Sequence, residues 1–168
     1  MILTFRVLFV FLILGHDRRH VLHFNVTSNF SAEWTAQQIV HTFLFDSVSR
    51  YSLRDRDGIY GGYFRHRIKN LGIGEVLTAA RSPWQNPYVE RLIGSIRRQC
   101  LDQVIVLNEQ HLRRILRSYS RYHHRSRCHL SLDGDAPEAR GVQGPELGGV
   151  IGLPEVGGLH HCYARKAA

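Results

Sequence analysis

The segment from residue 51 to residue 98 constrains this chain most, because it places one acidic residue after a short strand and another inside a helical pattern. Residues 51–54 read as an extended strand, and Asp55 follows directly. Glu90 lies near the start of an amphipathic pattern, and 34 residues separate the two acids. Strand ends and neighbouring helix starts gather at one edge of an α/β sheet. We therefore expect the two carboxylates to share one site.

An Asp–Glu pair of this kind suits a divalent metal for phosphodiester chemistry. Two Mg²⁺ or Mn²⁺ ions about 3.5–4 Å apart can activate the attacking oxygen, stabilise the leaving oxygen and neutralise phosphate charge. Mg²⁺ prefers oxygen ligands, and one or two protein carboxylates plus substrate phosphates often suffice. The pair alone does not decide the function, since a single Asp or Glu is more often a solvated surface charge or a helix cap.

The rest of the chain alternates strands and helices. Apolar and alternating patterns predict strands at residues 7–14, 20–27, 51–54 and 75–78. Helical periodicity follows Ser31 and Asn108, which suit caps, and Pro87, which suits a first helical turn. A third pattern covers residues 63–71 before Gly72. A hairpin followed by alternating strands and helices predicts an α/β fold with a mixed sheet flanked by helices.

Charge and cysteine content narrow the partners and the compartment. The formal net charge is +8 and the pI is about 9.9, which favours nucleic acid first and an anionic membrane second, with a plain solvated basic surface as the alternative. The chain has three cysteines and no CxxC pair, so we expect a reducing compartment without disulfides. The His- and Cys-containing stretch at residues 123–129 matches no standard zinc module.

The two ends of the chain are less regular. The apolar run at residues 7–14 is too short to span a bilayer and is expected to be a buried strand. A secreted basic protein, processed near Gly15, is the alternative interpretation of this start. Residues 141–158 are rich in Gly and Pro and are expected to be extended rather than packed. We therefore divide the chain into a core at residues 1–137 and a Gly-rich tail at residues 138–168.

Three sequence segments together resemble a known family. They are RDRDGIYGGYF at residues 54–64, PWQNPYVERLIGSIRR at residues 83–98 and HRSRCHLSLDGDAP at residues 124–137. They resemble the catalytic core of retroviral-type integrases and bacterial insertion-sequence transposases, the DDE group with an RNase H-like fold. The resemblance covers residues 7–137 and implies DNA integration or transposition by a mobile-element protein, acting on element ends and a target duplex. It also implies a bacterial cytoplasmic, nucleoid-associated protein that is a possible homo-oligomer when intact, with no membrane partner.

The resemblance assigns roles to individual residues. Asp55 and Glu90 match the second and last acids of the family and would bind Mg²⁺ or Mn²⁺, with Asp57 as the second choice for the former. Asn86 matches the Asn four residues before the metal-binding Glu. The expected nucleic-acid contacts are Arg91, Arg97, Arg98, Trp84 and Asn86. For any one of these arginines a solvated helix face is nearly as plausible, and an aromatic residue beside a Pro-rich loop, such as Trp84, more often packs locally.

One departure from the family pattern bears on activity. The first Asp of the family lies on a strand that precedes the predicted hairpin, and residues 7–27 already match that hairpin. We therefore expect a core that is truncated at its N-terminus, with its first strand largely missing, and inactive by itself. Whether the chain is an enzyme stays open, and the alternative function is a non-catalytic remnant that binds nucleic acid.

Overall fold

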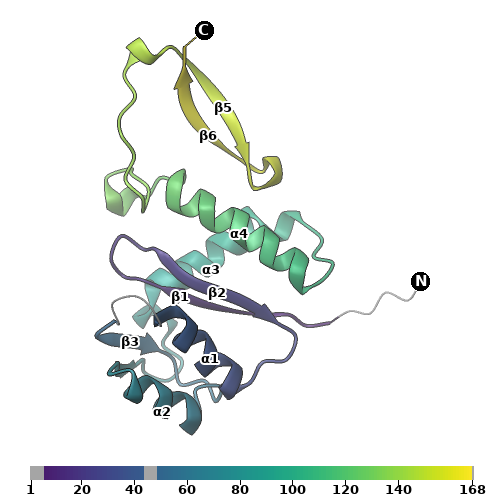
Figure 1. Ribbon diagram of the computed structural model, residues 1–168, viewed down its shortest axis with the longest axis vertical. Helices are drawn as coiled ribbons and strands as arrows, with labels where there is room; N and C mark the ends of the chain where they lie inside the picture. Colours follow the sequence, from purple (N-terminus) through teal and green to yellow (C-terminus); the bar gives the residue numbers. More distant parts are fainter. Residues whose placement is uncertain (1–5, 44–48, 168) are drawn as a thin grey trace, which may run out of the picture. The chain divides into compact units, whose positions relative to one another are not determined.

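The computed structural model describes residues 6–43 and 49–167, so the first five residues of the apolar start lie outside the described part. The chain forms two compact units (Figure 1). The first comprises Met1–Leu14 and Leu22–Leu92, and the second comprises Gly15–Val21 and Ile93–Ala168. Across the described ranges, no helix is long and apolar enough to cross a membrane.

The first unit holds the four predicted strands. β1 (Phe9–Leu14) pairs with β2 (Val21–Thr27), and the short connection between them makes this pair a hairpin. β3 (Tyr51–Arg54) pairs in parallel with β4 (Gly74–Leu77). The register places Arg54, the last residue of β3, opposite the last residue of β4. The residue after each strand therefore emerges at the same edge of this parallel pair.

The predicted α/β architecture is confirmed, but the described strands form separate small sheets rather than one. The hairpin and the parallel pair are separate two-stranded sheets in the described residues, because β1 pairs only with β2 and β3 pairs only with β4. The single mixed sheet expected from the sequence is therefore not closed by the described strands.

Two helices pack on these strands. In α1 (Ala32–Phe43) the Ser31 hydroxyl oxygen accepts a hydrogen bond from the backbone N–H of Trp34 at 3.2 Å, as its predicted capping role requires. α2 (Gly62–Asn70) ends before Gly72, whose φ of 74° is easily adopted only by glycine. α1 lies along the hairpin in Figure 1. Their shared core consists of Phe11, Ala36, Ile39, Phe64, Ile68 and Ile73.

α3 (Pro87–Gln99) begins in the first unit and continues into the second. Its buried residues include Leu92, Ser95 and Ile96, as helical spacing requires. The helix ends at Gln99, because the backbone leaves helical geometry at Cys100, where φ is −143°. Short 3-10 turns lie at Pro83–Gln85, Leu101–Gln103, Leu130–Leu132, Pro145–Leu147 and Val156–Gly158.

α4 (Glu109–Arg125) forms the centre of the second unit, and its predicted cap is confirmed. The side-chain oxygen of Asn108 accepts a hydrogen bond from the backbone N–H of His111 at 2.8 Å. The buried residues of the helix recur on one face, whereas most of its arginines are exposed. The buried set is Leu112, Leu116, Tyr119 and His123.

The C-terminal end of α4 holds residues 18–21 through histidine hydrogen bonds. Nε2 of His123 lies 3.2 Å from the carbonyl oxygen of Arg19, so this nitrogen carries the proton of the neutral ring. Nε2 of His124 accepts from the backbone N–H of Val21 at 2.9 Å, so its other ring nitrogen carries the proton. Burial lowers the pKa of His123 to about 3 and also lowers the pKa of His124. Both rings are therefore neutral at pH 7.

The sequence predicted an extended Gly-rich tail, but part of this segment forms a hairpin. β5 (Gly149–Glu155) pairs antiparallel with β6 (His160–Lys166). Gly157 and Gly158 have positive φ at the turn, which explains glycine there. His160 anchors the hairpin, since its ring stacks on Tyr122 at 4.3 Å and its Nε2 lies 2.9 Å from the carbonyl oxygen of Gln99.

Candidate metal and nucleic-acid site

The predicted catalytic Asp55 lies directly after β3 and is exposed. Its Oδ1 accepts a hydrogen bond from the backbone N–H of Asp57 at 3.2 Å. Oδ1 of Asp57 in turn accepts from the backbone N–H of Ile59 at 3.1 Å. Both carboxylates therefore help to shape the turn, and neither forms an ion pair within the described residues.

Arg54 fixes the backbone on which Asp55 stands. Only 7 % of its side chain is exposed, and its guanidinium donates to Oε1 of Glu75 at 2.9 and 2.7 Å. A third nitrogen donates to the carbonyl oxygen of Asp55 at 2.9 Å. The guanidinium carbon also lies 4.8 Å from the centroid of the Tyr60 ring. Asp55 therefore emerges from a backbone held by a buried, neutralised cation.

Tyr60 forms the wall beside this turn. Its ring packs on Phe64 with centroids 4.8 Å apart. Burial raises the pKa of Tyr60 to about 12, and the negative charge of Asp55 adds to that effect. The phenol is thus protonated and uncharged at neutral pH. Its ring gives the turn beside Asp55 an aromatic, less polar neighbour. The sequence placed an aromatic residue here but did not predict its contact with Arg54.

A series of hydrogen bonds joins the end of β3 to the loop that precedes α3. The backbone N–H of Thr78 donates to the carbonyl oxygen of Arg54, and Nε of Arg56 donates to the carbonyl oxygen of Thr78, both at 3.0 Å. The next residue, Ala79, donates its N–H to Oε1 of Gln85 at 2.6 Å. Gln85 directly precedes Asn86. The strand end that carries Asp55 and the start of the helix that carries Glu90 are therefore linked through one loop.

Glu90 lies in the first turn of α3 and is exposed. Its backbone N–H donates to the carbonyl oxygen of Asn86 at 3.2 Å, and its carboxylate forms no ion pair in the described part of the chain. Oδ1 of Asn86 is buried and lacks a hydrogen-bond partner. Trp84 is 70 % exposed in the same loop, which leaves its ring available to a ligand. The separation between the Asp55 and Glu90 carboxylates stays a prediction.

The chemistry of these side chains fits a divalent metal. Asp55 and Glu90 offer exposed carboxylate oxygens, and Asn86 offers an unsatisfied amide oxygen, all of them hard ligands of the kind that Mg²⁺ and Mn²⁺ bind. Within residues 6–43 and 49–167, no group of three or more His, Cys, Asp or Glu side chains is placed to hold a metal. The predicted pair would supply two carboxylates and would need further ligands from substrate or from outside these residues.

The predicted nucleic-acid contacts on α3 are all on its exposed surface. Arg91, Arg97 and Arg98 are exposed, whereas the neighbouring Leu92 and Ile96 are buried. Gly94 leaves space for Arg98, because a Cβ at that position would lie 2.9 Å from Nη1 of Arg98. The guanidinium of Arg98 thus lies back across its own helix. These arginines are accessible to DNA phosphates. A helix face that contacts only solvent would show the same exposure.

Comparison with known proteins identifies the segment that carries Glu90. Residues 71–137 match the family model of the integrase core domain. This part of the chain is therefore similar to an integrase core domain. The match includes Trp84, Asn86, Glu90 and the α3 arginines, while Asp55 precedes it. No curated protein matches the chain.

The fold is also similar to that of a solved structure. The chain is similar to a chain in the cryo-EM structure of the simian T-cell lymphotropic virus intasome in complex with PP2A regulatory subunit B56 gamma, with a TM-score of 0.56 and 13% identity. The alignment covers 69% of this chain and 41% of that one, so this chain spans about two fifths of its structural neighbour. At this identity the similarity concerns the fold alone, and it agrees with the expected RNase H-like fold.

Sequence reasoning missed the residues that support the candidate site. The sequence predicts strands at residues 51–54 and 75–78 but indicates no role for the side chains of Arg54 and Glu75. Their pairing follows from the parallel register of β3 and β4, which no local pattern reveals. Gln85 stood in a predicted loop without a role, and a polar residue next to the matched Asn86 was the available signal. The sequence motif indicated the two exposed acids. The residues that hold their backbone in place could be identified only from the three-dimensional structure.

Proposed function

We propose that this integrase core segment takes part in DNA integration or transposition by metal-dependent chemistry on phosphodiester bonds. The observation that carries the proposal is Glu90, exposed in the first turn of a helix that lies inside the integrase core match. Asp55 follows a strand whose end is linked by hydrogen bonds to the loop before that helix. The partner is DNA, and the cofactor is Mg²⁺ or Mn²⁺.

Each side chain would have a role that follows from its position and charge. Asp55 and Glu90 would hold the metal, and Asn86 would offer its unpaired amide oxygen nearby. Arg54 would keep the Asp55 backbone in place through its bonds to Glu75 and to the Asp55 carbonyl oxygen. When bound, the metal would neutralise phosphate charge and activate the attacking oxygen. Arg91 would bind a phosphate beside Glu90, as guanidinium groups do with two parallel hydrogen bonds.

A non-catalytic protein that binds DNA is the second candidate function. It is supported by the described residues, among which no group of three or more His, Cys, Asp or Glu side chains is placed to hold a metal. Both functions share the exposed arginines of α3. They differ in whether metal promotes a covalent change in DNA, so nicking of supercoiled plasmid separates them.

Metal binding by three matched variants tests the proposed site. Calorimetric titration with Mn²⁺ should show binding that Asp55→Asn and Glu90→Gln each reduce by at least about tenfold, since each removes one ligand charge. Asp57→Asn is the control, because its carboxylate accepts from Ile59 within the same turn. Equal losses in the Asp55 and Asp57 variants would contradict the assignment. DNA binding without Mn²⁺-dependent nicking would favour the non-catalytic function.

A further inference from the structure

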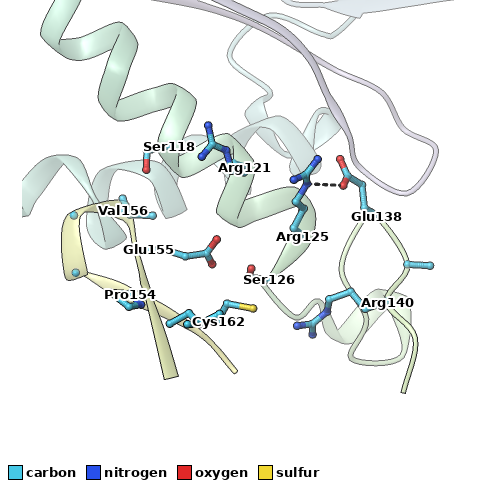
Figure 2. Close-up of a pocket in the computed structure, with 14 residues that line it drawn as sticks. Ser118, Arg121, Arg125, Ser126, Glu138, Arg140, Pro154, Glu155, Val156 and Cys162 are labelled. Carbon is cyan, nitrogen blue, oxygen red and sulfur yellow. Dashed lines mark hydrogen bonds and ion pairs between the residues drawn. The ribbon is translucent and has the colours of Figure 1, made fainter. Parts of the chain in front are cut away.

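A second polar site lies in the other unit, in a pocket of about 1050 Å³ between α4, residues 138–140 and the β5–β6 hairpin (Figure 2). The charged and nucleophilic side chains that line it are Arg121, Arg125, Arg140, Glu138, Glu155 and Cys162. Nothing in the metal site or in the matched motif of α3 uses this pocket. Its volume suits a small organic ligand or one residue of a polymer.

The wall formed by the hairpin is fixed to α4. His160, at the start of β6, stacks on Tyr122 with an interplanar angle of 5° and lies 2.9 Å from the Gln99 carbonyl oxygen. Val156, at the hairpin turn, is buried. His160 therefore holds the hairpin against both α4 and the end of α3, and the pocket belongs to the folded state of this unit.

The pocket carries cationic charge that the protein does not neutralise. Glu138 pairs with Arg125, whose Nε lies 2.9 Å from Oε2 of the carboxylate. Arg121 forms no hydrogen bond or ion pair within the described residues, and the guanidinium of Arg140 contacts only the Cys128 sulfur, at 3.6 Å. Arg121 and Arg140 thus lack a carboxylate partner while they line the same pocket. A phosphate group would supply the missing acceptors.

Glu155 adds a negatively charged carboxylate to another wall of the pocket. Its carboxylate points toward the middle of the pocket in Figure 2, near Ser126. Its Oε2 is buried and has no hydrogen-bond partner, an arrangement that is costly unless a ligand donates to the carboxylate. A simple anion satisfies the arginines but is repelled by Glu155. The fitting ligand brings both acceptor oxygens and N–H donors.

We propose that this pocket binds one nucleotide of single-stranded DNA, with its phosphodiester on Arg121 and Arg140 and an amino group of its base on Glu155. This proposal rests on the DNA function proposed above and adds a site and a base preference to it. Cytosine presents an amino donor at position 4, to which carboxylates bind, whereas thymine presents a carbonyl acceptor there. The pocket therefore prefers cytosine to thymine.

Fluorescence anisotropy of the full chain with labelled oligo-dC and oligo-dT of equal length tests this preference. Oligo-dC should bind at least about fivefold more tightly, because one well-matched base contact discriminates by that factor or more. Glu155→Gln should abolish the preference, since the amide of Gln can donate to the thymine carbonyl. Equal affinity for both oligonucleotides in the unmodified chain would overturn the proposal.

A matched pair of charge reversals tests the phosphate contact. Arg121 and Arg117 are both exposed and one turn apart on α4, but only Arg121 lines the pocket. Arg121→Glu should weaken oligo-dC binding at least about fivefold more than Arg117→Glu, because only the Arg121 variant loses a contact with the phosphate in the pocket. Equal effects would show nonspecific charge and overturn the proposal, as would equal competition by a poly-glutamate peptide of the same charge.

Two further measurements keep these outcomes interpretable. Circular dichroism melting of each variant should match the unmodified chain, and Glu155→Gln serves as the conservative change if Arg121→Glu does not fold. The Asp55→Asn Glu90→Gln double variant should retain its preference for oligo-dC. Retained preference with lost Mn²⁺ binding supports a separate nucleotide site, whereas lost preference in this double variant would contradict it.

Discussion

Arg54 and Glu75 form the buried ion pair that supports the candidate metal site, with two guanidinium nitrogens 2.9 and 2.7 Å from one carboxylate oxygen. The parallel register of β3 and β4 brings these residues together. The same guanidinium donates to the carbonyl oxygen of Asp55 at 2.9 Å. A change at Glu75 should therefore affect both the stability of the fold and the position of Asp55.

Glu75→Ala is expected to lower the free energy of unfolding by about 3 kcal/mol, because it leaves the nearly buried Arg54 cation without its partner. Urea unfolding followed by circular dichroism measures this loss. Glu109→Ala is the control, since its ion pair with Arg113 is more exposed on α4 and should contribute less than about 1 kcal/mol. Equal losses in the two variants would contradict a special role for Arg54 and Glu75.

Acidification should destabilise the second unit through His123. Burial lowers the pKa of this histidine from 6.5 to about 3, so the unfolded chain takes up a proton below pH 6.5 that the folded chain resists until about pH 3. Stability is therefore lost as pH falls from 7 to 5, by about 1–2 kcal/mol for this group. Urea midpoints at the two pH values measure the loss.

His123→Gln isolates this contribution, because its amide can still donate to the carbonyl oxygen of Arg19 and does not titrate. The variant should lose less stability than the unmodified chain between pH 7 and pH 5. His66→Gln, at an exposed position on α2, should behave like the unmodified chain. An identical pH dependence in the His123 variant would assign acid sensitivity to other groups.

The arginines of α3 should determine binding to duplex DNA. Glutamate substitutions at Arg91, Arg97 or Arg98 should each weaken binding and reduce the slope of log K against log salt by about 1, because each removes one phosphate contact. The same substitutions at Arg165 and Lys166 in β6 should have smaller effects. Fluorescence anisotropy over a salt series measures both quantities, and equal effects at the two places would indicate nonspecific charge.

The sequence was most informative where local chemistry decides the structure. Asn108 and Ser31 cap helices as expected, and the apolar spacing of α3 correctly left Glu90 on the exposed face. Each of these follows from side chains within a few residues of one another. The integrase motif added Asp55, which periodicity alone does not distinguish from other exposed acids.

Features that depend on distant pairing were not predictable in this way. The alternation in His160–Lys166 is weak, and its strand forms because seven residue pairs join it to β5. The pocket beside Arg121 exists only once that hairpin is fixed to Tyr122 by His160. Likewise, the two ladders of the first unit were expected in one sheet, and only the fold shows that β1 and β3 have no mutual pairing in the described residues.

The central claim is that Asp55 and Glu90 bind the same metal ion, and paramagnetic broadening by Mn²⁺ in NMR spectra of the ¹⁵N-labelled chain tests it most directly. We predict that the backbone amide signals of both residues broaden together as Mn²⁺ is added. Asp55→Asn should leave the Glu90 signal sharp, and Glu90→Gln should leave the Asp55 signal sharp. Broadening at one residue that persists when the other acid is replaced would contradict a shared metal site.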